Sequence, residues 1–319
     1  MVDRELEALK SIDLRAYAAG QGYELDRKES WRGCAVMRHL NGDKIIIKLD
    51  AADGHYVYFS VRDDTDNGTI IDFVRHRRRL SLGAIRKELR PWLLMPAPAL
   101  APYPPLASTG KDRMRVEAAF AGMRETLRHP YLERERGIPG ALLASERFAG
   151  CVRIDLRGNA VFPHFDEQGL CGYEIKNRGF TGFASGGSKG LWSSRSEVED
   201  RRLVFCESAI DALSYALLFP DDHTRYASIG GKPNPVQPEL IRASAARMPG
   251  CSEIIAAMDA DAAGAKLAEL VRVATAQTGR ADLCFGIEEP LSCKDWNDQL
   301  RAQRTPEHGR ITLMDAQPK

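Results

Sequence analysis

The C-terminal third of the chain alternates short apolar runs with segments of helical spacing, and this pattern predicts a parallel sheet with helices on its faces. Apolar runs at residues 201–206, 253–258 and 281–287 have the length of buried strands. Residues 208–219 and 265–276 carry apolar side chains at helical spacing, and a short helical tail follows the last strand. Because strands connected in this way run parallel, their carboxyl ends meet at one edge, where open α/β sheets bind ligands.

Acidic residues closely follow each of these predicted strand ends. They are Glu207 with Asp211, Asp259 with Asp261, and Asp295 with Asp298. Mg²⁺ usually takes one or two carboxylates together with waters and substrate phosphates, so acids gathered at one edge suit it. Each acid also has a purely structural explanation, such as a helix cap at Asp259 or Asp261. Glu207 and Asp211 would then be an exposed pair one helical turn apart, and Asp298 a solvated side chain.

At these residues the chain resembles the Toprim family, the catalytic domain of bacterial-type primases, type IA and type II topoisomerases and some nucleases. In that family a Glu ends the first strand and an Asp-x-Asp ends a later one, matching Glu207, Asp259 and Asp261. The turn 228–231, Ser-Ile-Gly-Gly, matches the small-residue turn after the intervening strand. The resemblance covers residues 200–300. It implies that Glu207, Asp259 and Asp261 hold Mg²⁺ or Mn²⁺. It also implies that the catalytic set is completed by supporting acids, namely Asp211, Asp295 and Asp298.

Composition limits the remaining possibilities. The formal net charge of the 319 residues is +1, so contacts with nucleic acid must come from local basic patches. No apolar run approaches the ~18 residues of a membrane span, and the charged N-terminal ten residues lack a signal-peptide core. We therefore expect a cytoplasmic protein without a membrane partner. The seven cysteines include no Cys-x-x-Cys pair, which argues against disulfides and against a ribbon zinc site.

Local composition and the family resemblance together predict four segments. Prolines concentrate in residues 91–111, which we interpret as a semi-rigid linker. The predicted fold is α/β: a Toprim domain with a Rossmann-like parallel sheet and a C-terminal tail at 200–319, preceded by a mixed α+β subdomain at 112–199. A small ribbon-like β module occupies residues 1–90.

The N-terminal module resembles the zinc ribbon of bacterial-type primases, but it lacks the cysteine ligands. We expect helices at 13–21, 70–79 and 82–89 and strands at 31–40, 44–49 and 55–61, with a hairpin turn at 41–42. Residues 59–62, Phe-Ser-Val-Arg, stand where the second cysteine pair belongs. Cys34 and His39 are the only soft ligands nearby, and two ligands do not make a structural zinc site. We expect no zinc, with Cys34 in the core and His39 as a surface or turn residue.

Two groups of basic residues are candidate phosphate contacts. The first is the Arg-His-Arg-Arg-Arg stretch at 75–79, which contributes Arg75, Arg77, Arg78 and Arg79. It either binds nucleic acid or is a solvated helix face. The second lies in the middle subdomain, where strands are expected at 151–156, 160–166 and 169–176. This subdomain resembles a domain of unknown function from mobile-element proteins and the N-terminal subdomain of the primase core. The match implies that template or nucleotide phosphates are contacted by Lys176, Arg178 and Lys189.

These features favour a primase-like, metal-dependent nucleotidyltransferase that acts on a single-stranded DNA template with nucleoside triphosphates, in mobile-element replication or transfer. Two alternatives stay open: a Toprim nuclease or nickase, and a non-catalytic single-stranded DNA-binding accessory protein. The stretch 182–189 is not a P-loop, because Ser188 stands where the lysine is required, so we expect no ATPase. A helicase or another replication protein is a candidate partner that the sequence does not identify.

Overall fold

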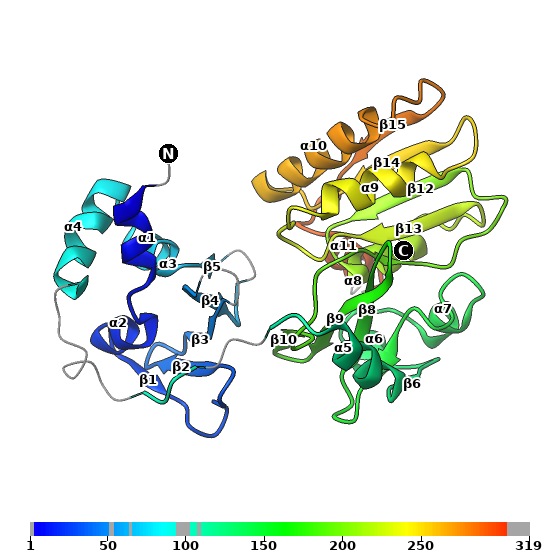
Figure 1. Cartoon of the computed structure of the whole chain (residues 1–319). Coiled ribbons are helices and arrows are strands. Elements are labelled where there is room, and N and C mark those ends of the chain that lie inside the picture. The colour runs from blue at the N-terminus through cyan, green and yellow to red at the C-terminus, as the bar shows by residue number, and fades with distance from the viewer. Residues whose placement is uncertain (1–2, 51–53, 64–65, 94–102, 107–109, 305–319) are drawn as a thin grey trace, which may run out of the picture. The chain divides into compact units, whose positions relative to one another are not determined.

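The computed structural model describes residues 3–50, 54–63, 66–93, 103–106 and 110–304 (Figure 1). The chain divides into two compact units. The first comprises Met1–Asp112 with Gly179–Thr181, and the second comprises Arg113–Arg178 with Gly182–Lys319. The predicted C-terminal tail beyond residue 304 lies outside the described residues.

The first unit packs helices against an antiparallel sheet. The helices are α1 (Arg4–Lys10), α2 (Leu14–Gly20), α3 (Ile70–Arg78) and α4 (Leu82–Leu93). The strands follow one another across the sheet as β1 (Tyr23–Leu25), β2 (Ala35–His39), β3 (Lys44–Leu49), β4 (Tyr56–Ser60) and β5 (Asn67–Gly68). Alternate strand residues such as Met37, Ile45 and Tyr58 are buried with Phe73 of α3 in one apolar core. Cys34 is also buried, as predicted.

The sequence predicted most of the helices and strands of the first unit. The hairpin between β2 and β3 turns at Gly42, whose φ of 85° suits glycine. The prediction missed α1, β1 and β5, which are short elements with little periodicity. It also began the linker too early, because α4 continues through Pro91 to Leu93.

The described part of the predicted linker is not an extended spacer. Tyr103 and Leu106 pack against the core of the first unit. The guanidinium of Arg15 lies 5.3 Å from the centre of the Tyr103 ring and donates a 2.6 Å hydrogen bond to Pro104 O. Residues 94–102 and 107–109 of the linker lie outside the described residues.

The second unit begins with an antiparallel sheet and short helices. The helices are α5 (Arg113–Ala121), α6 (Pro130–Arg134) and α7 (Gly140–Ala144). The strands lie in the order β10 (Phe180–Phe183, divided between the two units), β9 (Gly169–Asn177), β8 (Ala160–Asp166), β7 (Arg153–Ile154) and β6 (Arg124–Glu125). The predicted strand series is confirmed. Helix α5 ends at Ala121, and β6 follows it closely along the chain.

The C-terminal part of this unit forms the predicted parallel sheet. Its order is β11 (Trp192–Ser193), β13 (Thr224–Ser228), β12 (Arg202–Cys206), β14 (Glu253–Ala257) and β15 (Cys284–Glu288), with only β11 antiparallel among these strands. The helices are α8 (Ala209–Leu218), α9 (Gln237–Ala246), α10 (Ala262–Ala276) and α11 (Trp296–Arg304). The fold is the expected α/β class.

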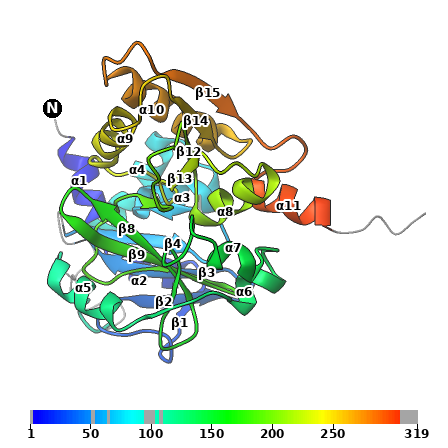
Figure 2. The same ribbon diagram turned by 90° about the vertical axis from the view of Figure 1, so that its right-hand side faces the viewer.

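The central strand β12 is buried on both faces. In β12, Val204 and Cys206 join a core with side chains of α8 and α11. Leu203 and Phe205 join a second core with side chains of α9 and α10. Figures 1 and 2 show these helix pairs on opposite faces of the sheet. This double coverage explains the nearly continuous apolar runs that predicted the strands.

The sheet that precedes the parallel sheet shares one of its cores. Ala160 and Phe162 of β8 belong to the same buried cluster as Val204 and Cys206 of β12. Successive side chains of a strand point to opposite faces, so the face of β8 and β9 that carries Phe162 packs against the parallel sheet. Within the described residues, no helix is long and apolar enough to cross a membrane.

Candidate active site

Glu207 lies directly after β12 and is held by the turn that follows the neighbouring strand β13. The backbone N–H groups of Gly230 and Gly231 donate hydrogen bonds of 2.8 and 3.1 Å to Glu207 O. Both glycines have positive φ values, 75° and 76°, which other residues rarely adopt. The small-residue turn therefore fixes the backbone position of Glu207.

Asp259 and Asp261 lie between β14 and α10, and they have different roles there. Asp261 is the N-cap of α10, and its Oδ1 accepts hydrogen bonds from Ala263 N at 2.8 Å and Gly264 N at 2.9 Å. A Cβ atom at Gly264 would lie 2.0 Å from Asp259 O, so only glycine allows the helix to approach this closely. Asp261 is therefore a helix cap, which is the structural explanation that the sequence offered for this acid. Asp259 does not cap the helix.

The side chain of Asp259 is enclosed by other acids. Its Oδ1 is buried and has no hydrogen-bond partner among the described residues. Burial raises the pKa of Asp259 to about 9, and the charges of four neighbouring carboxylates add to this effect. These neighbours are Asp211, Glu207, Asp295 and Asp261. The structure thus brings five of the six predicted acids into one electrostatic cluster, called the acidic cluster below.

Asp211 lies at the base of the acidic cluster, where it joins two helices. Its Oδ2 accepts a 2.6 Å hydrogen bond from Ser208 Oγ, and its Oδ1 accepts a 3.3 Å bond from Asn297 N at the start of α11. Burial raises the pKa of Asp211 to about 6, with a further contribution from Asp295. Asp211 therefore links the start of α8 to the start of α11 next to the other acids of the cluster.

Asp298 is the predicted acid that the structure leaves out of the acidic cluster. It lies one helical turn beyond Asp295, whose Oδ1 accepts a 2.7 Å hydrogen bond from Asp298 N. The side chain of Asp298 is exposed and forms a 3.2 Å ion pair with Arg301. The physical reason is that the buried side of α11 carries Trp296 and Leu300, which turns position 298 toward solvent.

Lys294 is a charged neighbour of the cluster to which the sequence analysis assigned no role. Its Nζ lies 3.6 Å from Asp261 Oδ2. Burial alone would lower the pKa of Lys294, but the charges of Asp261, Asp259 and Glu207 raise it. The sequence offered one signal for the contact between Lys294 and Asp261, namely that Lys294 directly precedes Asp295.

The acidic cluster fits a divalent cation held partly by substrate. Within the described part of the chain, no three His, Cys, Asp or Glu side chains form a preformed metal-binding group. Mg²⁺ commonly binds through one or two carboxylates and completes its shell with waters and phosphates, so a complete protein cage is not required. The Oδ1 of Asp259 is buried without a hydrogen-bond partner among the described residues, and the neighbouring carboxylates add like charge around it, which a bound cation would offset.

Two of the three basic residues predicted in the middle subdomain lie beside the acidic cluster. Lys176 interacts electrostatically with Asp211, and Lys189 does so with Glu207. The Nζ of Lys189 donates hydrogen bonds of 2.6 Å to Gly230 O and 2.9 Å to Lys232 O. Lys189 thus also stabilises the turn that holds Glu207. Arg178 differs, because its side chain is 81% exposed and pairs with Glu135 at 2.9 Å.

The basic stretch at 75–79 is largely engaged in ion pairs within the first unit. Arg77 contacts Asp66 at 2.6 Å and Asp43 at 2.8 Å, and its guanidinium lies 4.8 Å from the centre of the Phe73 ring. These two ion pairs make Arg77 a structural residue rather than an open phosphate contact. The sequence analysis missed them because Asp43 and Asp66 lie on loops that are distant from Arg77 in the sequence. The neighbouring pairs are Arg75 with Asp72 and Arg78 with Glu88. A phosphate-binding role for Arg75, Arg78 and Arg79 stays a prediction.

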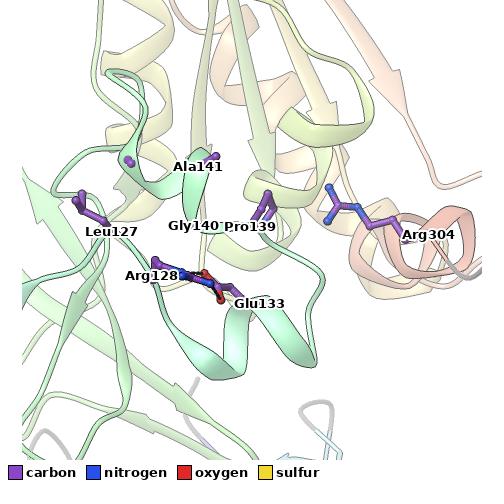
Figure 3. Close-up of a pocket in the computed structure, with 8 residues that line it drawn as sticks. Leu127, Arg128, Glu133, Pro139, Gly140, Ala141 and Arg304 are labelled. Atoms are coloured by element: carbon purple, nitrogen blue, oxygen red, sulfur yellow. Dashed lines mark hydrogen bonds and ion pairs between the residues drawn. The ribbon is translucent and has the colours of Figure 1, made fainter.

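A pocket of the second unit lies apart from the acidic cluster. It is lined by residues of the 127–144 segment and by Arg304 of α11 (Figure 3). Arg128 and Glu133 form a 2.8 Å ion pair there, and Arg304 donates a hydrogen bond to Gly137 O. No residue of the acidic cluster lines this pocket.

Comparison with protein families identifies the class of this fold and site. Residues 204–300 match the family model described as Toprim-like, so the acidic cluster lies within a Toprim-like domain. Residues 130–200 match the family described as a protein of unknown function, DUF3991. The chain is thus a Toprim-domain protein in which a DUF3991 domain directly precedes the Toprim-like domain. The sequence-based recognition of both parts is confirmed.

Solved structures give weaker likenesses. One is a chain from the complex of bacteriophage T7 lagging-strand DNA polymerase with primase domains of two gp4 subunits, bound to an RNA/DNA hybrid and dTTP. It is 18% identical with a TM-score of 0.35, covering 55% of this chain and 87% of that one. The other is a DNA primase domain from Pseudomonas aeruginosa, 14% identical with a TM-score of 0.32, covering 48% of this chain and 53% of that one. No curated protein gives a significant match.

Proposed function

We propose that this protein is a primase-like nucleotidyltransferase that uses a divalent cation and acts on single-stranded DNA with nucleoside triphosphates. The observation that carries the proposal is the acidic cluster around the unsatisfied Oδ1 of Asp259, with the positive charges of Lys176 and Lys189 beside it. Acids that hold a cation and lysines that neutralise phosphates are what phosphoryl transfer requires of a protein.

Glu207 and Asp259 are the residues that would hold the cation. When bound, Mg²⁺ or Mn²⁺ would neutralise charge on the triphosphate and favour attack of a 3′-hydroxyl on the α-phosphate. In the absence of the cation, the carboxyl of Asp259 keeps its proton near neutral pH, because its pKa is raised to about 9. Asp211, anchored by Ser208 Oγ and Asn297 N, holds α8 and α11 together beneath these groups.

The test is incubation of the full chain with single-stranded DNA, labelled nucleoside triphosphates and Mg²⁺ or Mn²⁺. We expect labelled products longer than one nucleotide from the wild type and none from Asp259→Asn or Glu207→Gln. Asp298→Asn is the matched control, because it makes the same chemical change outside the acidic cluster. Shortened DNA without incorporated label would replace the proposal by a nuclease. Neither product, with binding of DNA retained, would indicate an accessory protein.

A further inference from the structure

A second buried polar group, distinct from the acids, lies on the sheet that precedes the Toprim-like domain. His164 of β8 and Glu174 of β9 occupy the strand face that carries Phe162, and this face packs against the parallel sheet. Lys176 follows Glu174 by two residues on the same face. Three residues with charge or proton-binding capacity therefore point toward the domain that contains the acidic cluster.

His164 and Glu174 are buried, and each has a side-chain atom that lacks a hydrogen-bond partner among the described residues. His164 has 0% of its surface exposed and Glu174 6%. Because His164 Nδ1 lies 2.8 Å from the carbonyl oxygen of Gly190, this nitrogen carries a proton and acts as the donor. His164 Nε2 then faces Glu174 Oε1 at 3.5 Å. Neither His164 Nε2 nor Glu174 Oε2 has a hydrogen-bond partner among the described residues.

The surroundings keep Glu174 charged. Burial alone would raise the pKa of Glu174, but Lys176, His164 and Lys189 hold it well below its usual range. Lys176 Nζ lies 3.6 Å from Glu174 Oε2, outside hydrogen-bond distance. A buried carboxylate that is not fully hydrogen-bonded is costly, so its presence calls for a role other than packing.

The position of Lys176 suggests that role. It interacts electrostatically with Glu174 on one side and with Asp211 of the acidic cluster on the other. The His164–Glu174 pair lies close to the turn at Gly230, because a Cβ atom on Gly230 would lie 2.3 Å from Glu174 Oε1 and 2.8 Å from His164 Cε1. The same Gly230 donates its N–H to Glu207 O. The pair His164–Glu174 thus lies between Lys176 and the turn that holds the first acid.

We propose that Glu174, which lies 3.5 Å from His164, is a positioning residue that orients Lys176 toward the substrate phosphate beside the acidic cluster. This inference rests on the proposed function for the identity of the substrate. Its physical basis is that a fixed carboxylate restricts a flexible lysine to one direction, which lowers the entropic cost of binding phosphate.

The experiment measures binding of inorganic tripolyphosphate to the full chain by calorimetry in the presence of Mg²⁺. A charge-assisted hydrogen bond lost from the site corresponds to roughly a tenfold or greater loss of affinity. We expect such a loss for Lys176→Gln and for Glu174→Gln. Lys176→Arg, which keeps the cation, should bind within about threefold of the wild type. Arg272→Gln removes a solvent-exposed cation of α10 that pairs with Glu269, and it should leave binding unchanged.

A double-mutant cycle separates positioning from a merely structural effect. If Glu174 acts through Lys176, the variant carrying both Gln substitutions should bind no more weakly than Lys176→Gln alone. Additive losses would overturn the positioning role, as would unchanged binding in Glu174→Gln. Unchanged binding in Lys176→Gln would overturn the phosphate site. Wild-type binding that follows the expected pattern without any nucleotide incorporation would support this inference and refute the proposed function.

Discussion

Replacing Asp259 by Asn should stabilise the protein when no divalent cation is present. The reason is that burial, together with the charges of the neighbouring carboxylates, raises the pKa of Asp259 from 3.8 to about 9. Between these two pH values the folded chain retains a proton that the unfolded chain has released. The stability contributed by this proton is fully present below pH 3.8 and is lost as the pH rises through about 9.

The size of the effect follows from the binding of one proton. A single proton changes the free energy of unfolding by at most ~1.4 kcal/mol per pH unit. Asp259 is partly solvated, so screening reduces this limit. We therefore expect wild-type stability to fall by about 1–2 kcal/mol between about pH 6 and about pH 8 through this group. Asp259→Asn should lack this decline and exceed the wild type at about pH 8 by at least this amount, because the wild-type decline already begins at about pH 3.8.

Urea unfolding in the presence of EDTA, followed by tryptophan fluorescence, measures this difference. Trp192 and Trp296 are buried in the core of the second unit and report on its unfolding. Adding Mg²⁺ at about 100 times its dissociation constant should stabilise the wild type by about 2.7 kcal/mol and the variant little, which reverses their order. Asp298→Asn should behave like the wild type throughout. The reasoning is refuted if Asp259→Asn shows wild-type pH dependence, or if Asp298→Asn shows the same gain.

Three further predictions concern the backbone, the first unit and zinc. Gly264→Ala should destabilise the chain by at least ~2 kcal/mol in urea unfolding, because the added Cβ would clash with Asp259 O. The control Gly122→Ala, whose Cβ would make only ordinary contacts, should change stability by less than about 1 kcal/mol. Arg77→Ala should lower stability by about 2 kcal/mol through its lost ion pairs, whereas Arg79→Ala should not, and equal effects on stability would contradict the structural role of Arg77. Elemental analysis should find less than stoichiometric zinc, and a stoichiometric content would contradict the expected zinc-free module.

The sequence could predict those parts of the fold that depend on local periodicity. The apolar runs predicted β12 and β14. The acids that follow these strands lie together at the carboxyl edge of the sheet, as the sequence predicted. Strand β15 begins at Cys284 rather than at 281, because the preceding residues form a turn. Helix α10 begins at Ala262, before the predicted start at 265, because Asp261 caps it.

The sequence could not predict contacts between distant segments. The ion pairs of Arg77 with Asp43 and Asp66 join residues that only the folded first unit brings together. The contact between His164 and Glu174 depends on the register of β8 and β9, which places them diagonally on one face. The direction in which Asp298 points depends on which side of α11 is buried.

The most direct test of the central claim is binding of Mn²⁺ to the full chain, measured by electron paramagnetic resonance of the free ion. If the acidic cluster is a divalent-cation site, the wild type should remove Mn²⁺ from solution, and nucleoside triphosphate should strengthen this binding. Asp259→Asn and Glu207→Gln should abolish this binding, whereas Asp298→Asn should retain it. Equal binding of Mn²⁺ by the wild type and by Asp259→Asn would contradict the claim.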